Sequence, residues 1–264
     1  MVRVAVLGSG SRGNAIVVEA SGTRVAVDAG FGPRVLAKRC RAAGIAPESI
    51  AACVITHEHV DHASGVRSAQ RRWGWEIIST QPTLTAVGAE GERVRAARHG
   101  ETVTVGDLSI TLIAVTHDAA APSAVLVDDR VGGARVGIAH DLGVVPDTLR
   151  TAFARLDILV LEANHDVGML RAGPYPPFLQ ERILGRAGHL SNVQASRFAA
   201  EVAHHGLRAV VLAHLSEQNN TPQIARDAVA RALRATPFHG TLITAAQDAA
   251  CAVGDRREEQ LRLF

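Results

Sequence analysis

Length, composition and charge exclude several classes of protein. The chain has 264 residues, of which 47% are hydrophobic and 20% charged, so it can bury a substantial core and is not expected to be disordered. No apolar run reaches about 18 residues, and the opening segment lacks the features of a signal peptide, which predicts a cytoplasmic protein without membrane association. The net charge of +2 does not by itself indicate a nucleic-acid partner. The three cysteines lack CxxC spacing, which indicates reduced thiols rather than disulfides or a cysteine zinc site.

Six apolar, β-branched segments end abruptly at a carboxylate or an imidazole, and each is predicted to be a strand. In chain order they are residues 23–27 before Asp28, 50–56 before His57, 108–116 before His117, 134–140 before Asp141, 156–161 before Glu162 and 207–213 before His214. Helical patterns are found at residues 66–73, 146–155, 177–186, 191–205 and 222–235. Because each strand ends in a possible ligand, we expect the strand ends to converge on one edge and form a site there.

The order of these elements predicts an α/β fold. Early strands are followed by alternating helices and strands, which suggests two sheets with helices outside them, an αββα sandwich. There is no internal repeat, no long linker and no abrupt change of composition, so residues 1–264 are expected to form a single domain.

The segment His57-Glu58-His59-Val60-Asp61-His62 places four possible metal ligands directly after a buried strand. At positions i and i+2 of an extended loop, His57 and His59 point the same way, whereas Asp61 and His62 enter the next helix and diverge toward a second position. Polar turn residues would explain one histidine. They do not explain this cluster together with His117, Asp141 and His214 at other strand ends. The pattern predicts a site for two cations.

The segment resembles the HxHxDH signature of the metallo-β-lactamase superfamily, and the order of the later ligands is similar as well. The resemblance implies that the first metal would be bound by His57, His59 and His117, the second by Asp61, His62 and His214, with Asp141 as the bridge. It also implies that Asp28 supports the histidine loop from behind the ligands. The fold implied is a metallo-β-lactamase αββα sandwich.

The ligand types constrain the metal and the branch of the superfamily. Nitrogen and oxygen donors suit two divalent ions, Zn(II) first, with Mn(II) or Fe(II) also suitable. No cysteine stands at a matching ligand position, unlike in the β-lactamases proper, which disfavours antibiotic hydrolysis. Flavodiiron proteins carry Glu where His59 stands here, so oxygen reduction is disfavoured too. A metal pair of this kind activates water for hydrolysis, with Asp61 expected to orient the nucleophile or to accept its proton.

Glu162 at a strand end and His189 just before a helix are the candidate acid–base pair. A carboxylate bonded to that imidazole would keep it protonated for donation to a leaving oxygen. The pair resembles the Glu and His dyad of the ribonuclease Z branch. The alternative is that Glu162 pairs with an arginine and His189 caps the helix.

Larger motifs resemble the YycJ (WalJ) family of bacterial proteins. They are residues 8–14 (GSGSRGN), 164–166 (NHD), 173–176 (GPYP), 188–192 (GHLSN) and 212–222 (LAHLSEQNNTP), so that the resemblance spans most of residues 1–225. It implies an exonuclease-type phosphodiesterase acting on nucleic acid, with DNA favoured. No insertion like the flexible arm of ribonuclease Z is evident, which disfavours precursor-tRNA processing.

Three further residues are candidates for substrate binding. Ser11 and Asn14 lie in a glycine-rich turn whose amides could hold a phosphate, although a tight hairpin explains the glycines equally well. His165 could reach the same cleft. Arg67, Arg71 and Arg72 beside Trp73 and Trp75 could form a nucleic-acid surface, but a helix packed by its tryptophans with solvated arginines is the favoured interpretation.

Two other functions remain open. A small-molecule hydrolase of cyclic phosphodiesters, thioesters or lactones would use the same metals and needs no nucleic-acid surface. A non-catalytic scaffold is disfavoured, because clustered charged and imidazole groups are costly to desolvate without a use. The oligomeric state is left open.

Overall fold

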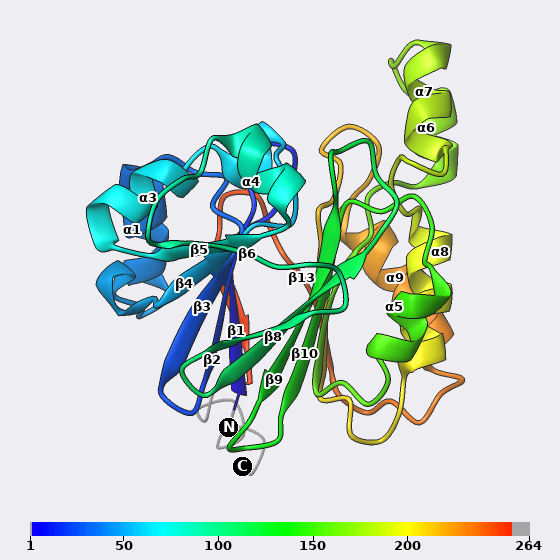
Figure 1. Ribbon diagram of the computed structural model, residues 1–264. Helices are drawn as coiled ribbons and strands as arrows, with labels where there is room; N and C mark the ends of the chain where they lie inside the picture. Colours follow the sequence, from blue (N-terminus) through cyan, green and yellow to red (C-terminus); the bar gives the residue numbers. More distant parts are fainter. Residues whose placement is uncertain (1, 255–264) are drawn as a thin grey trace.

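The computed structural model describes residues 2–254, whose strands form two stacked sheets with helices on both outer faces (Figure 1). The strands are β1 (Val2–Gly8), β2 (Ala15–Ala20), β3 (Thr23–Val27), β4 (Ala52–Val54), β5 (Glu76–Ser79), β6 (Val94–Ala96), β7 (Thr102–Val105), β8 (Leu108–Ala114), β9 (Ser123–Asp129), β10 (Arg135–Ala139), β11 (Ile158–Glu162), β12 (Ala209–Ala213), β13 (Thr241–Thr244) and β14 (Cys251–Val253).

The helices connect these strands and cover the sheets. They are α1 (Pro33–Ala42), the 3-10 helix η1 (Pro47–Ser49), α2 (Val60–Ala63), α3 (Val66–Trp73), α4 (Gln81–Val87), α5 (Asp147–Ala152), α6 (Val167–Ala172), α7 (Pro177–Leu184), α8 (Asn192–Val202) and α9 (Pro222–Leu233). Among residues 2–254, no helix is both long enough and apolar enough to cross a bilayer.

Within the described residues, each sheet has seven strands and mixes antiparallel with parallel pairing. The first has the order β14-β1-β2-β3-β4-β5-β6, with parallel pairs from β3 to β6. The second has the order β13-β12-β11-β10-β9-β8-β7, with parallel pairs from β10 to β13. Strands β11 and β12 are buried along their whole length, as expected for parallel strands covered on both faces.

Three apolar layers hold the sandwich together. The middle layer packs the inner faces of the two sheets against each other, through residues such as Val4, Val54 and Val211. Sheet one packs outward on α1 and α3, and sheet two packs outward on α5, α8 and α9. The predicted αββα sandwich is confirmed, with an apolar cluster between each pair of neighbouring layers.

The six strands and five helices expected from the sequence are all present. Residues 23–27 and 66–73 have the expected bounds, and the other elements differ at one or both ends. The helix expected at 146–155 spans only Asp147–Ala152, and the one at 191–205 ends at Val202. Glu162 is the last residue of β11 rather than the residue after it. Several elements were not predicted, among them β6 and β14, since segments of three residues carry no measurable periodicity.

The edge of the sandwich at which the strand ends converge has two unusual features. Asp28, Asp141 and His214 each follow a strand in the left-handed backbone region, with φ of 62°, 57° and 53°, a strained conformation that concentrates at functional sites. Helices α6 and α7 extend beyond the layers at the same end of the molecule (Figure 1). This projection was not anticipated from the sequence.

Candidate metal centre

Side chains from both sheets meet at this edge. Ligand atoms from three groups each lie within 4.8 Å of one another: His57 with His59 and His117, Asp61 with His62 and His214, and His57 with His62 and Asp141. The His57–His62 segment follows β4 of sheet one and runs into α2, whereas His117, Asp141 and His214 follow β8, β10 and β12 of sheet two. The structure therefore brings together all seven residues that the sequence indicated as ligands.

The first group is oriented by contacts that use one ring nitrogen of each histidine. Thr56 Oγ1 donates to Asp28 Oδ2 at 2.8 Å and therefore accepts from His57 Nδ1, 3.0 Å away. His117 Nδ1 donates to the Gly188 carbonyl at 3.1 Å. His59 Nε2 donates to the Asp118 carbonyl at 3.2 Å. Each ring keeps its other nitrogen as a lone-pair donor, which is the form that binds a metal.

The second group lies beside the first and shares Asp141 with it. His62 Nδ1 donates to Asp28 Oδ2 at 2.7 Å, so His62 Nε2 faces Asp141 Oδ2 at 2.7 Å and Asp61 Oδ2 at 3.2 Å. His214 Nε2 lies 3.5 Å from Asp61 Oδ2. Asp141 Oδ2 is also 3.8 Å from His57 Nε2. Asp141 thus contacts both groups. The ring nitrogens His57 Nε2 and His62 Nε2 both face Asp141 Oδ2, and a positive charge between these atoms would stabilise the arrangement.

Unpartnered polar atoms test whether a cation fits this cluster. His57 Nε2, Asp141 Oδ2 and His214 Nε2 are buried and make no hydrogen bond with any described residue. Leaving such groups unsatisfied in a protein interior is costly. All three atoms point into the same cluster of nitrogen and oxygen donors, so the residues present fit divalent metal ions.

The charges of the cluster are strongly coupled. Burial and the neighbouring His62 lower the pKa of His57 well below its usual range. Burial opposes the charge of His62 and His214, but the carboxylates outweigh it, raising the pKa of His62 well above its usual range and that of His214 to about 9. Asp141 is fully buried, yet the same imidazoles hold its pKa well below the usual range. The carboxylates are therefore anionic and attract cations.

Glu162 and His189 form the pair expected from the sequence. His189 Nδ1 lies 2.7 Å from Glu162 Oε1 and 3.1 Å from Asp141 Oδ1. Burial opposes protonation of His189, but Glu162 outweighs it and raises the pKa of the imidazole to about 10. Glu162 is fully buried, and its Oε2 accepts from the amides of Leu142 and Leu190. Among residues 2–254 no arginine pairs with Glu162, whose partners are His189, His214 and these two amides, which argues against the alternative interpretation of this residue.

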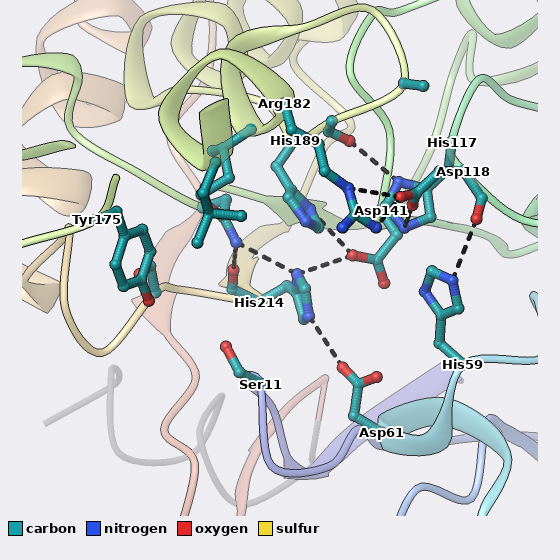
Figure 2. Close-up of a pocket in the computed structure, with 16 residues that line it drawn as sticks. Ser11, His59, Asp61, His117, Asp118, Asp141, Tyr175, Arg182, His189 and His214 are labelled. Atoms are coloured by element: carbon teal, nitrogen blue, oxygen red, sulfur yellow. Dashed lines mark hydrogen bonds and ion pairs between the residues drawn. The ribbon is translucent and has the colours of Figure 1, made fainter. Parts of the chain in front are cut away.

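The metal cluster opens into a pocket of about 310 Å³. Figure 2 shows Tyr175, Arg182 and His189 on one side of it, with Ser11 and Asp61 on the other. The remaining lining residues are His59, His117, Asp118, Asp141, Asn164, Leu179, Ile183, Ala187, Gly188, His214 and Ser216. His189 thus stands between the cluster and the space that a substrate would occupy.

Two of the expected substrate-binding residues do not line the pocket. Asn14 is 1% exposed, and its side chain is used within the fold: Oδ1 accepts from Ser9 and Gly10, while Nδ2 donates to the Gly10 carbonyl. His165 is completely buried, and neither of its ring nitrogens has a partner among the described residues. Only Ser11 of the three faces the pocket.

Some pocket residues were missed by the sequence analysis. Asp118 follows the ligand His117, and its side chain pairs with Arg182 Nε at 2.9 Å. Tyr175 and Arg182 belong to the projecting α6–α7 region. The sequence predicted the helix α7 there, but not which of its faces meets the pocket. Trp75, by contrast, is fully buried and donates to the Pro47 carbonyl, which supports the interpretation of tryptophan packing.

Comparison with known proteins agrees with this geometry. Residues 23–215 match the family model described as beta-lactamase superfamily domain. The chain is 32% identical over 232 residues to a Streptococcus pneumoniae protein named exodeoxyribonuclease WalJ, covering 84% of this chain and 85% of the relative. It is 29% identical over 238 residues to exodeoxyribonuclease YycJ of Bacillus anthracis, covering 88% and 89%.

A solved structure supports the fold independently. The metallo-β-lactamase fold protein YhfI from Bacillus subtilis superposes with a TM-score of 0.72 at 19% identity, covering 95% of this chain and 98% of that one. At this identity the likeness concerns the fold, and the sequence relatives supply the family. The chain therefore belongs to the beta-lactamase superfamily and, within it, to the family of the WalJ and YycJ proteins.

Proposed function

We propose that this protein is a dinuclear-metal phosphodiesterase that degrades DNA as an exonuclease. The observation that carries the proposal is the convergence of seven ligand side chains, five of which line one open pocket, beside His189, whose Nδ1 lies 2.7 Å from Glu162 Oε1. Hydrolysis of a phosphodiester needs an activated water, neutralisation of the phosphoryl oxygens and a proton for the leaving oxygen.

Two divalent cations would be held by separate sets of residues that share one bridge. One set is His57, His59 and His117, the other is Asp61, His62 and His214, and Asp141 contacts both. Mixed imidazole and carboxylate donors suit Zn(II) best and accept Mn(II) or Fe(II). Such ions lower the pKa of water and neutralise a phosphoryl oxygen.

The protein side chains supply the proton transfers. His189 is held by Glu162 through Nδ1, and its Nε2 makes no hydrogen bond with any described residue, so Nε2–H is available to the leaving oxygen. Glu162 positions the ring and keeps it charged. Burial opposes the negative charge of Asp61, but contacts with His214 and His62 outweigh it and hold its pKa well below the usual range. Asp61 is thus a weak base, which favours an orienting role over proton acceptance.

The relatives support DNA as the substrate. Both are named exodeoxyribonucleases and align with most of this chain. A terminal nucleotide would enter the pocket between Ser11 and Tyr175, which both line it (Figure 2).

The decisive experiment incubates the purified protein with DNA labelled at either end, single- or double-stranded, and with labelled RNA, in the presence of Mn(II) or Zn(II). We expect metal-dependent shortening of DNA from one end and about two bound metal ions per chain. His189→Ala should lower the cleavage rate by about 100- to 10,000-fold while leaving the metal content unchanged, because general acid catalysis typically contributes that much.

His205→Ala is the matched control, because His205 is an exposed histidine that lies against His239 rather than in the pocket. It should cleave like the unmodified protein. Full activity of His189→Ala would refute the role of this residue. Two bound metals without cleavage of any polymer would refute the nuclease and point to a small ester or cyclic phosphodiester.

A further inference from the structure

The loop and helix after α6, residues 173–187, form one wall of the pocket, and we call this segment the α7 arm. It extends beyond the two helical layers (Figure 1). Leu179, Arg182 and Ile183 lie at positions i, i+3 and i+4 of α7 and all line the pocket, as expected for one face of a helix. Tyr175 precedes the helix and lines the pocket as well. The arm presents a continuous face to the metal cluster.

The arm carries aromatic side chains of a kind that are mostly buried elsewhere among the described residues. Aromatic residues make up only 3% of the sequence, and Tyr175 is its single tyrosine. Phe178 is 75% exposed, and among the described residues it is the one aromatic side chain with large exposure. By contrast, Trp75, Phe153 and Phe198 are at most 1% exposed. An exposed phenylalanine next to a pocket tyrosine indicates a surface for stacking.

The position of Tyr175 is fixed by the fold of the arm. Gln180 is largely buried, and its Nε2 donates to the Tyr175 carbonyl at 2.9 Å. Pro176 and Pro177 set the backbone at the start of α7, where proline is favoured because its φ already suits a helix. The backbone that carries the ring is therefore ordered before a ligand arrives, which lowers the entropy cost of binding.

Arg182 places a cation at the rim of the metal cluster. Its Nε lies 2.9 Å from Asp118 Oδ2, and the two side chains are 65% and 32% exposed. An exposed ion pair of this kind contributes little and exchanges readily. A guanidinium is a good ligand for a phosphate because its planar fork donates two parallel hydrogen bonds. Arg182 can therefore leave Asp118 for a phosphate that enters the pocket.

We propose that Tyr175 and Arg182 form a binding subsite for the end of a DNA strand, in which Tyr175 stacks on an unpaired base and Arg182 binds the neighbouring backbone phosphate. This inference rests on the proposed nuclease function and specifies how its substrate is held. Aromatic stacking combined with a backbone contact is the usual way in which proteins hold single strands, so the subsite would hold a single-stranded end. Phe178 offers a second ring just outside the pocket.

The test measures binding of a fluorescent single-stranded DNA of about ten nucleotides, with uncleavable phosphorothioate linkages, to the metal-loaded protein by anisotropy. Tyr175→Ala and Arg182→Ala should each weaken binding about tenfold. Arg182→Ala should also reduce the slope of log Kd against log salt by about 0.7, the value for one lost phosphate contact on a single strand. Tyr175→Ala should leave that slope unchanged, and Tyr175→Phe, which keeps the ring, should recover the lost affinity.

Arg171→Ala is the matched control, since Arg171 belongs to α6 and pairs with Glu181 instead of lining the pocket. It should bind the probe with unchanged affinity and slope. Unchanged affinity in both subsite variants, or an equal loss in Arg171→Ala, would overturn the inference. Cleavage of ordinary DNA by the unmodified protein is measured in parallel, so a failed subsite with intact cleavage is distinguishable from a failed nuclease proposal.

Discussion

The base and the rim of the pocket are held by ion pairs of opposite character. At the base, Asp28 and His62 meet at 2.7 Å with side chains that are 0% and 1% exposed. At the rim, Asp118 and Arg182 are 32% and 65% exposed. A buried pair is costly to break, because one partner is left charged in a medium of low dielectric constant, whereas an exposed pair contributes at most about 1 kcal/mol.

The backbone shows the same contrast. Three residues at the base, Asp28, Asp141 and His214, are held at positive φ, whereas no residue of the α7 arm is. Strained backbone persists only where the surrounding structure fixes it. The rigid base of the pocket therefore positions the metal ligands. The rim, where an exposed ion pair can exchange its carboxylate for another anion at low cost, contacts the substrate.

Replacing Asp28 is the strongest test of a rigid base. In Asp28→Asn, the amide that replaces Oδ2 would face His62 Nδ1–H, so the imidazole must move its proton to Nε2, the atom that faces Asp61 and Asp141. Asparagine tolerates the positive φ at this position. We expect metal affinity to fall by about 10- to 100-fold, as for other residues that orient a metal-binding histidine. Competition with a chromophoric chelator measures the change.

Asp129→Asn provides the control for the loss of a buried carboxylate. Asp129 is 3% exposed and accepts from Ser21 and from the amide of Val131, at the end of β9. The Asp129→Asn variant should bind metal with the same affinity as the unmodified protein. If Asp28→Asn bound metal as tightly as the unmodified protein, the base would tolerate a change of its hydrogen-bond network and the prediction of a rigid base would be wrong.

A weaker effect is expected from Glu162, which joins the base to the catalytic imidazole. Because His189 acts in its protonated form, and Glu162 raises its pKa to about 10, activity should persist up to nearly pH 10. In Glu162→Gln the charge of Glu162 is lost while that of Asp141 remains, so the pKa of His189 falls and its proton is lost at lower pH. The alkaline limb of the kcat/KM profile should then move down by at least about one pH unit, and the rate at pH 9 should fall about tenfold.

Glu181→Gln on the exposed side of the arm controls for the loss of a negative charge and should keep the original profile. An alkaline limb at the same pH in Glu162→Gln would mean that another group limits the reaction. A uniform loss of rate at every pH would point to a misplaced ring rather than to a changed pKa.

Most of the base could be predicted from the sequence, because its signals are local. Four possible ligands stand within the six residues His57–His62, and the other three each end an apolar strand, so the parallel strand ends bring them together. The pairing of Glu162 at a strand end with His189 before a helix was predicted from the resemblance to the ribonuclease Z dyad, and the two side chains do meet. Asn14 and His165 were misplaced, since a polar residue in a loop gives no sign of whether its side chain turns inward.

The rim could not be predicted in the same way. The pattern at residues 177–186 indicates a helix, but which face meets the pocket depends on how α7 docks on the rest of the molecule. Asp118 and Arg182 are 64 residues apart, and neither lies at a strand end with a ligand spacing. Exposed residues that contact one another across a pocket leave no periodic signal in the chain.

The smallest effect is expected at the rim itself, where Asp118 and a phosphate compete for Arg182. Asp118→Asn removes the competing charge and should tighten binding of the single-stranded DNA about two- to threefold, the range that an exposed ion pair can contribute. The Asp118 carbonyl that accepts from His59 is unchanged. Because Asp118 Oδ1 also lies 3.2 Å from His117 Nε2, metal content is determined alongside. Weaker binding at equal metal content would mean that Asp118 positions the arm, and the rim would then share the rigidity of the base.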